Sequence, residues 1–309
     1  MIDKLIKLLS FFFFLFGLYM VYKEIKLIDS EKIFLGLKNT SVFILVLGSL
    51  ATILNFIILS FYDKLGLLYV KKKLSFLKTL KISALSFAVS NLAGHTYASG
   101  GAIRYLFLRP LGFKKKEILL LVTLISLFSI FGLLGTLFLA LLLKVLFVVP
   151  IQWHHPLILY FSAIGILMFF LLYFKLDSQK EKTFQIKNEK ILLPQKNLSF
   201  KGLLVGCLDL LSLFLVFYIF LNLPDAKFLS VLVAFILASF LAFLSQVPAG
   251  IGVFESSFLC LFPHTLPQKE NILLAFILYR LIYYIFPFLI SINYFLIQKL
   301  KTLKKINKK

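Results

Sequence analysis

The feature that most constrains this chain is a series of apolar runs, each long enough to cross a bilayer, that recurs from end to end. A membrane-spanning helix needs about 20 mostly apolar residues. The runs of that kind are Leu5–Tyr22, Ser41–Tyr62, Ile118–Leu143, Pro156–Phe174, Leu203–Asn222 and Asn271–Ile297. With 61% apolar residues and a mean hydropathy of +0.97, the composition excludes an ordinary soluble domain. The sequence predicts an all-α polytopic membrane protein, with residues 1–309 forming a single integral membrane domain.

Two further apolar segments, at about Lys81–Phe113 and Phe228–Phe262, are interrupted in the middle by small and polar residues. The first break is SNLAGHTYASGGAIRY, from Ser90 to Tyr105, and the second is SQVPAGIGVFESS, from Ser245 to Ser257. Interrupted segments at corresponding places in two halves of a chain indicate a binding site near the middle of a bilayer. We therefore expect the functional site at these two breaks.

The distribution of lysine predicts how the chain is oriented in the membrane. The formal net charge is +21, and the basic residues gather in Asp63–Lys81, in Lys175–Lys201 and in the tail from Lys299. Short loops rich in Lys and Arg stay in the cytoplasm. Attraction to anionic lipid explains this charge better than nucleic-acid binding, which we do not expect. Both termini are predicted to be cytoplasmic.

The same rule predicts that the broken segments do not cross. If Lys81–Ala98 spanned the membrane, Arg104, Arg109 and Lys114–Lys116 would lie outside, against the charge rule. We therefore expect this segment to enter from the cytoplasm and return, and Phe228–Phe262 to do the same from the outer face. Six spanning helices and two re-entrant helical hairpins then form an inverted-topology repeat, with halves 1–150 and 151–309. The alternative is a bundle of eight spanning helices with kinks.

The first break contains residues suited to irregular backbone at membrane depth. Gly94, Gly100 and Gly101 permit positive φ and close approach, and Asn91 can hydrogen-bond stray amides. The sequence predicts that a helix restarts at about Ala102, so that its free amides point toward the break and attract an anion. Arg104, one turn further on, can form a forked contact with a phosphate.

The second break has the same character. Pro248 ends one helix, Gly250 and Gly252 allow a turn, Val253 begins the next helix, and Glu255 falls in its first turn. The alternative explanation for both breaks is that small residues merely let helices pack closely.

Ionisable residues inside apolar segments are functional candidates in a membrane. Arg280 lies mid-helix in LAFILYRLIYYIFP, and we expect its partner to be Glu255 or a ligand anion. Asp209, in GCLDLLS, is a candidate for a head-group contact or a coupling proton. Tyr283 shares a face with Tyr279 and could line a polar path with Arg280.

His95 lies inside the first break and raises the possibility of acid–base catalysis. No acid, second histidine or metal-ligand spacing accompanies it in the sequence, which favours a histidine that hydrogen-bonds in a cavity. We expect no metal and no cofactor, and the sequence contains no GxxxxGK[ST] loop for nucleotide binding.

The segments NLAGHTYASGGAIRYLFLRPLGF, VPAGIGVFES and AFILYRLIYYIFP, in that order, resemble the lysylphosphatidylglycerol synthase transmembrane-region family, and especially the membrane half of bacterial multiple peptide resistance factors. The resemblance covers nearly the whole chain. It implies translocation of phospholipids, including aminoacylated phosphatidylglycerol, across the bacterial inner membrane. Carried over by position, the motifs indicate Asn91, Gly94, Gly100, Gly101, Arg104, Tyr105, Pro248, Gly250, Gly252, Glu255 and Arg280.

The sequence departs from the family pattern at two places. Ala249 stands where the family often has glycine, so we expect a stiffer turn there. The chain stops at Lys309, whereas the synthases continue into a soluble aminoacyltransferase domain, so we expect it not to make the aminoacyl lipid. The expected function is a lipid translocase that contacts membrane phospholipids. The alternatives are an ion-coupled transporter of a small anion, a membrane-embedded lipid-modifying enzyme, and a subunit that anchors one; a homodimer also stays open.

Overall fold

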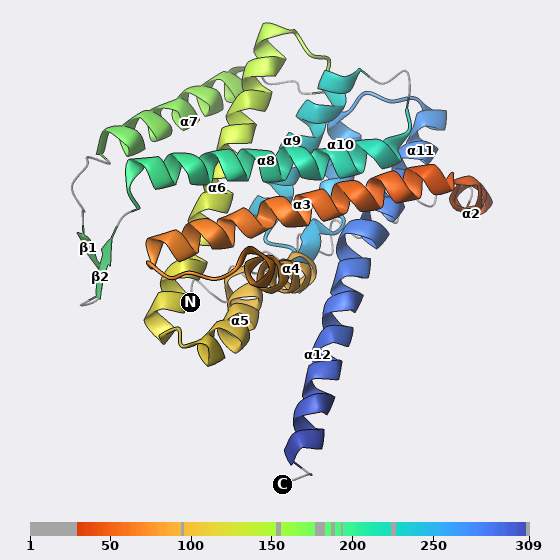
Figure 1. The fold of residues 1–309 in the computed structure, drawn as a ribbon. Helices are drawn as coiled ribbons and strands as arrows, with labels where there is room; N and C mark the ends of the chain where they lie inside the picture. The colour runs from red at the N-terminus through yellow and green to blue at the C-terminus, as the bar shows by residue number, and fades with distance from the viewer. Residues whose placement is uncertain are drawn as a thin grey trace, which may run out of the picture.

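The computed structural model describes residues 30–93, 96–152, 156–176, 183–186, 189–192, 194–223 and 227–306 of the chain. These residues form an almost entirely helical membrane protein (Figure 1). Within them, six helices are long and apolar enough to cross a membrane, in agreement with the predicted fold class. The predicted span Leu5–Tyr22 lies outside the described residues.

Five of the spans match runs predicted from the sequence. They comprise α3 (Val42–Tyr69), α6 (Lys115–Leu146), α7 (Pro156–Leu176), α8 (Lys196–Leu221), and the continuous rod of α11 (Leu266–Tyr279), the π-helix η3 (Arg280–Ile285) and α12 (Phe286–Ile306). The sixth is α9 (Phe228–Ser245), which the sequence analysis placed in the second hairpin. With 18 residues, α9 is about as long as the hydrocarbon core of a bilayer is thick.

The centre of the molecule is built where α6 crosses α8, which itself lies alongside α3 (Figure 1). Gly132 of α6 faces Gly206 of α8 so closely that a Cβ added to Gly132 would lie 2.2 Å from the Cα of Gly206. Only glycine allows two helix backbones to touch in this way, and small residues at such crossings are typical of membrane proteins. An aromatic core further along α8 includes Phe217, Phe235 and Phe258, all fully buried.

Both broken segments fold as helical hairpins. The first consists of α4 (Phe76–Ala93) and α5 (Thr96–Leu108), which pack against each other. The second consists of α9, a short 3-10 turn η2 (Pro248–Gly250) and α10 (Val253–Leu261), with α10 packed on α9. Because α4 also contacts η2 and η3, the two breaks meet in the interior. That they enter the membrane from opposite faces, and that the halves 1–150 and 151–309 are inverted repeats, stay predictions.

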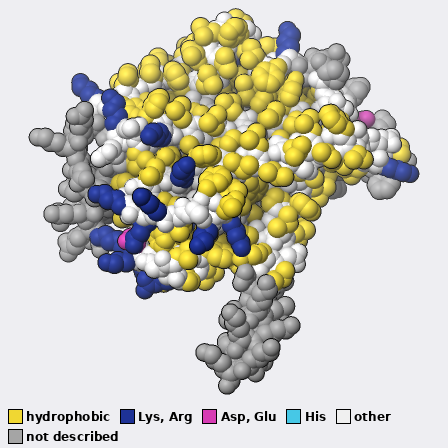
Figure 2. Space-filling model, viewed as in Figure 1, with side chains coloured by type: hydrophobic (Ala, Val, Ile, Leu, Met, Phe, Trp, Pro, Cys, Tyr) yellow, Lys and Arg dark blue, Asp and Glu magenta, His cyan; other side chains and the backbone are white. Residues whose placement is uncertain are grey.

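The remaining elements are short or peripheral. They are α2 (Ser30–Asn39), η1 (Arg109–Leu111), and the strands β1 (Thr183–Ile186) and β2 (Glu189–Leu192), which pair antiparallel in a small ribbon between α7 and α8. Much of the visible surface is hydrophobic, and Lys and Arg gather over the ends of α3 and α5 and the start of α6 (Figure 2). This separation suits a protein with one basic end at a membrane surface. The cytoplasmic location of that end, and of both termini, stays a prediction.

Candidate functional site

The first break is shorter than the sequence predicts. Helix α5 begins at Thr96, not at about Ala102, so Gly100 and Gly101 lie within a regular helix. The predicted anion site at a helix start after Gly101 is therefore wrong. Gly100 is needed for packing instead, because a Cβ there would lie 3.0 Å from Nη1 of Arg104 and 3.2 Å from the Cβ of Ser90. Gly94 and His95 lie outside the described residues.

Arg104 forms an enclosed ion pair with Asp63 of α3. Its Nε donates to Oδ1 and its Nη2 to Oδ2, both at 2.7 Å, and the side chains are 0% and 4% exposed. The guanidinium also lies 4.7 Å from the ring centre of Phe87, and Nη1 has no partner among the described residues. The paired face of Arg104 is thus occupied by a carboxylate. Tyr105, the next residue, is 40% exposed and turns away from this pair.

The second break is irregular backbone, as the sequence predicts. Gln246, Ala249, Gly250 and Gly252 all have positive φ, between 52° and 80°. Helix α10 then starts at Val253, which confirms the predicted restart. Its first free amide, that of Gly252, donates to Oε2 of Glu255 at 2.8 Å. The chain's own carboxylate therefore occupies the position that an anionic ligand would take.

Arg280 fixes this loop in place. Its Nε and Nη2 donate to Oε1 of Glu255 at 2.8 and 2.6 Å, and its Nη1 donates to the carbonyl oxygen of Ala249 at 2.5 Å. The ring centre of Tyr284 lies 4.9 Å from the guanidinium carbon. Of the two partners expected for Arg280, the structure has Glu255. The π-helical turn from Arg280 to Ile285, a feature often found at functional sites, presents these side chains.

A cavity of about 730 Å³ lies between the two breaks. Its walls come from α3, α4, α6, α8, α9, η2, α10 and the end of the α11–η3 rod. The polar groups on its walls are Ser90, Asn91, Ser126, Ser129, Asp209, Ser239, Gln246, Tyr279, Tyr283 and Tyr284. Among the lining residues in the described part of the chain, Asp209 carries the one formal charge. The cavity therefore has polar side chains and one acidic group on walls that are otherwise apolar, and both membrane-embedded arginines lie outside these walls.

A chain of hydrogen bonds connects both halves of the protein at this cavity. Asn91 donates to the hydroxyl of Tyr283 at 3.3 Å, and Tyr283 donates to Oδ1 of Asn55 at 2.8 Å. Nδ2 of Asn55 in turn donates to Oδ1 of Asp209 at 3.0 Å, while Tyr62 donates to Oδ2 at 3.1 Å. The chain ends at the carboxylate of Asp209, which accepts directly from Asn55 and Tyr62.

The structure sorts the predicted site residues into three places. Asn91, Asp209, Gly250 and Tyr283 line the cavity. The loop behind its wall is built by Pro248, Gly252, Glu255 and Arg280. The remaining described ones, Gly100, Gly101, Arg104 and Tyr105, belong to α5, whose residues do not line the cavity.

Sequence reasoning missed three residues. Asp63 was assigned to a basic loop because Lys64 follows it, yet it belongs to α3 and pairs with Arg104. Asn55 and Tyr62 were passed over within an apolar run. A single amide in the middle of ATILNFIILS is itself a signal, because a polar group at membrane depth needs a partner.

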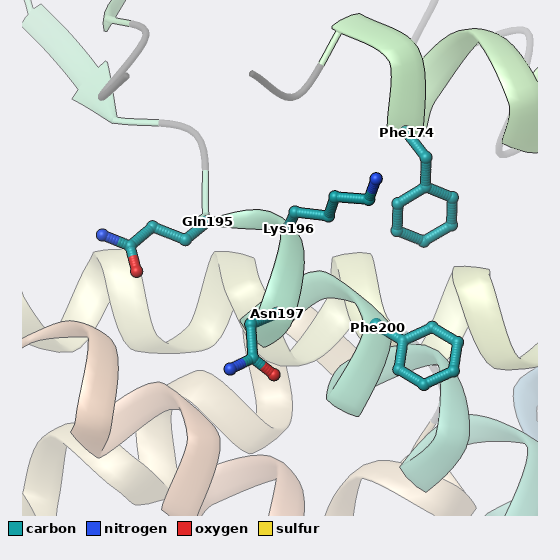
Figure 3. A pocket seen from close by; sticks show the side chains of 5 residues that line it. All are labelled: Phe174, Gln195, Lys196, Asn197 and Phe200. Atoms are coloured by element: carbon teal, nitrogen blue, oxygen red, sulfur yellow. The ribbon is translucent and has the colours of Figure 1, made fainter. Parts of the chain in front are cut away.

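A second cavity, of about 690 Å³, lies away from both breaks, where α7 ends and α8 begins. Lys196 extends there toward Phe174, with Phe200 on the next turn of α8, while Gln195 and Asn197 point elsewhere (Figure 3). None of its lining residues takes part in the hydrogen-bond chain. The candidate site is therefore the central cavity.

Comparison with known proteins agrees with this architecture. The model of the family described as lysylphosphatidylglycerol synthase TM region matches residues 5–291. Inner membrane protein YbhN of Escherichia coli K12 is 24% identical over 298 residues, which cover 94% of this chain and 91% of that protein. A phosphatidylglycerol lysyltransferase of Staphylococcus aureus is 27% identical over 291 residues, covering 90% of this chain. This chain spans only 32% of that enzyme's length. The protein belongs to the family of lysylphosphatidylglycerol synthase transmembrane regions.

Proposed function

We propose that this protein is a lipid translocase, which moves the head group of a phospholipid or aminoacyl-phospholipid across a bacterial inner membrane while the tails stay in the bilayer. The observation that carries the proposal is the cavity of about 730 Å³ between the two breaks, whose walls carry polar side chains from ten of the described residues within an otherwise apolar bundle. A polar head group cannot cross the hydrocarbon core without such a compartment, because unsatisfied polar groups there cost several kcal/mol each.

The walls of the cavity favour a lipid over a soluble solute. Phe243 of α9 lines the cavity and is 45% exposed. We infer that the cavity opens beside Phe243, on a helix that is apolar enough to contact lipid. Lipid tails can remain outside such an opening while the head group enters.

The charge of the cavity also revises which residues contact the head group. Arg104 and Arg280 are held by carboxylates of the chain, so we assign head-group contacts to Asn91, Tyr283 and the lining serines. Transport of a small free anion, the alternative function, is less well supported, because the one formal charge on the described cavity wall is negative. A lipid phosphate differs from that anion because its anchored tails supply part of the binding energy.

The test is reconstitution of the full chain in liposomes with tail-labelled phosphatidylglycerol or lysyl-phosphatidylglycerol, followed by chemical quenching of the outer leaflet. Ser239→Phe on α9 fills the cavity, and Ser162→Phe on α7 adds the same ring at an exposed position of a lipid-facing helix. We expect lipid movement in the wild type and in Ser162→Phe, and little in Ser239→Phe. Wild-type vesicles that match protein-free vesicles, or equal rates in the two variants, would overturn the proposal.

A further inference from the structure

Asp209, inside the apolar helix α8, has no ion pair with a cation among the described residues. Asp63 is paired with Arg104, and Glu255 with Arg280. Asp209 lies in α8 on the cavity wall, and no salt bridge reaches it from the described residues. A partly buried carboxylate on a cavity wall within the membrane, with no counter-ion, is a position where a cation or a proton is expected to bind.

The neighbours of Asp209 on every packed element are uncharged. Asn55 and Tyr62 face it from α3, Tyr283 reaches it through Asn55, and Ser126 and Ser129 share the cavity wall from α6. The titratable groups around it are Tyr62, Tyr279, Tyr283 and Tyr284, together with Cys207 on α8 itself. None of these supplies positive charge, so the state of the carboxylate depends on what the cavity delivers.

We propose that Asp209 is the site at which this protein binds a coupling proton, and that protonation there drives the rearrangement of the two breaks. This inference rests on the proposed lipid translocation, to which it adds an energy source. One proton from water in the cavity bonds to a carboxylate oxygen of Asp209, and the charge of the side chain changes from −1 to zero. No other bond is formed or broken.

The hydrogen-bond chain shows how that change reaches the breaks. Donors to an ionised carboxylate form bonds about twice as strong as donors to a neutral group. Protonation therefore weakens the bonds from Asn55 and Tyr62, and the new O–H group requires an acceptor where a donor now points. The disturbance passes through Asn55 and Tyr283 to Asn91, which lies in the last turn of α4, within the first break.

The second break is reached through the same tyrosine. Tyr283 belongs to the π-helical turn that also carries Arg280, the residue bonded to Glu255 and to the carbonyl oxygen of Ala249. A shift of this turn moves the guanidinium that holds the loop. One titratable group is thus connected to both hairpins, which is the arrangement that a coupled transporter needs.

The first measurement is independent of transport. Infrared difference spectra of the reconstituted full chain, recorded as a function of pH, report the carbonyl stretch of a protonated carboxyl group. We expect such a band in the wild type, its loss in the isosteric Asp209→Asn, and its persistence in Glu117→Gln, which removes a partly exposed carboxyl group at the start of α6. A spectrum of Asp209→Asn identical to the wild type would overturn the proposal.

The second measurement is lipid movement with and without a pH gradient across the liposome membrane. Coupling free energies between sites correspond to factors of about 5 to 150. We expect a gradient to change the wild-type rate by about tenfold, and Asp209→Asn to move lipid at the same rate with and without it. A gradient response retained in Asp209→Asn would overturn the proposal. So would a defect in that variant confined to lipids with cationic head groups, which would identify Asp209 as their counter-ion.

A wild type that moves no lipid but shows the Asp209 band would separate the two proposals. Translocation, and coupling with it, would then be wrong, and the proton site would stand on the infrared result alone.

Discussion

The two buried arginines of this protein form ion pairs of different kinds. Arg104 and Asp63 meet through two parallel bonds of 2.7 Å, with side chains 0% and 4% exposed. Arg280 directs two nitrogens to one oxygen of Glu255, with side chains 16% and 9% exposed, and its third nitrogen goes to a loop carbonyl group. In the first pair, both carboxylate oxygens of Asp63 accept from Arg104, and the pair joins α5 to α3. The second pair hydrogen-bonds to the backbone of the second break, through the carbonyl oxygen of Ala249 and the amide of Gly252. Its loss should therefore affect function more than stability.

The largest expected effect is the loss of protein stability when the Arg104–Asp63 pair is broken. Asp63→Asn leaves the guanidinium of Arg104 buried and uncompensated, which typically costs about 3–5 kcal/mol. Unfolding of the purified protein in detergent, followed by denaturant titration, measures the loss. The control is Glu117→Gln. Among the described residues, the ion pair of Glu117 is with the exposed Lys72 at 3.6 Å, and a glutamine can still accept from the amide of Lys114, so stability should change by about 0.5 kcal/mol or less.

A double variant tests whether the uncompensated charge of Arg104 causes the loss of stability in Asp63→Asn. Replacing both partners, as Asp63→Leu with Arg104→Met, removes the uncompensated charge and should recover much of the stability lost in Asp63→Asn. If Asp63→Asn is as stable as Glu117→Gln, the Arg104–Asp63 pair does not stabilise the fold as its geometry indicates.

The second prediction concerns Glu255→Gln, which changes the pair that Glu255 forms with Arg280. We expect a smaller loss of stability, about 2 kcal/mol, because a charge-assisted bond is weakened while an amide oxygen can still accept from Gly252 or Arg280. Lipid movement per folded molecule should fall much further than this loss explains, since the loop beside the cavity loses its anchor. A rate that is unchanged after correction for folded protein would remove the distinction between the two pairs.

The sequence predicted the second break more accurately than the first, and the difference has a physical reason. In the second break, Pro248 and the glycines predict a chain interruption on backbone grounds alone, and Glu255 was expected to pair with Arg280 because both lie within apolar segments. The structure has the restart at Val253 and the pair as expected. Local chemistry was sufficient there because the loop is stabilised by its own residues.

In the first break, local chemistry was misleading. Gly100 and Gly101 follow polar residues and resemble a loop, yet packing against α4 and α6 makes a helix of this stretch. The partner of Arg104 is 41 residues away, at the end of a helix whose last turn looked like a cytoplasmic loop. Contacts between elements decide such cases, and a single sequence shows the elements without showing which of them touch.

The third prediction compares glycine in the two breaks. Gly250 has a φ of +62°, and a Cβ there would lie 2.8 Å from the Cβ of Ala242. Gly250→Ala should therefore cost about 1–2 kcal/mol from the left-handed backbone alone. In Gly101→Ala the added Cβ would meet Val122 at an ordinary 3.4 Å within a helix, so stability should rise by about 0.5–1 kcal/mol. Denaturant titration of both variants should give opposite signs, and equal signs would mean that the two breaks are alike.

The smallest expected effect is at Ala249, where the second break has a non-glycine residue at a φ of 52°. Ala249→Gly relieves about 1–2 kcal/mol of left-handed strain and loses part of that gain to the greater freedom of glycine in the unfolded chain. The net result should be a stabilisation of about 0.5 kcal/mol. The matched control, Ala102→Gly at an exposed position of α5, should instead cost about 1 kcal/mol because its backbone is helical. If both substitutions destabilise the protein, the strain at Ala249 is offset by a contact of its methyl group. In that case the stiffer turn contributes to holding the cavity wall, since Ala249 lines the cavity and accepts the hydrogen bond from Arg280.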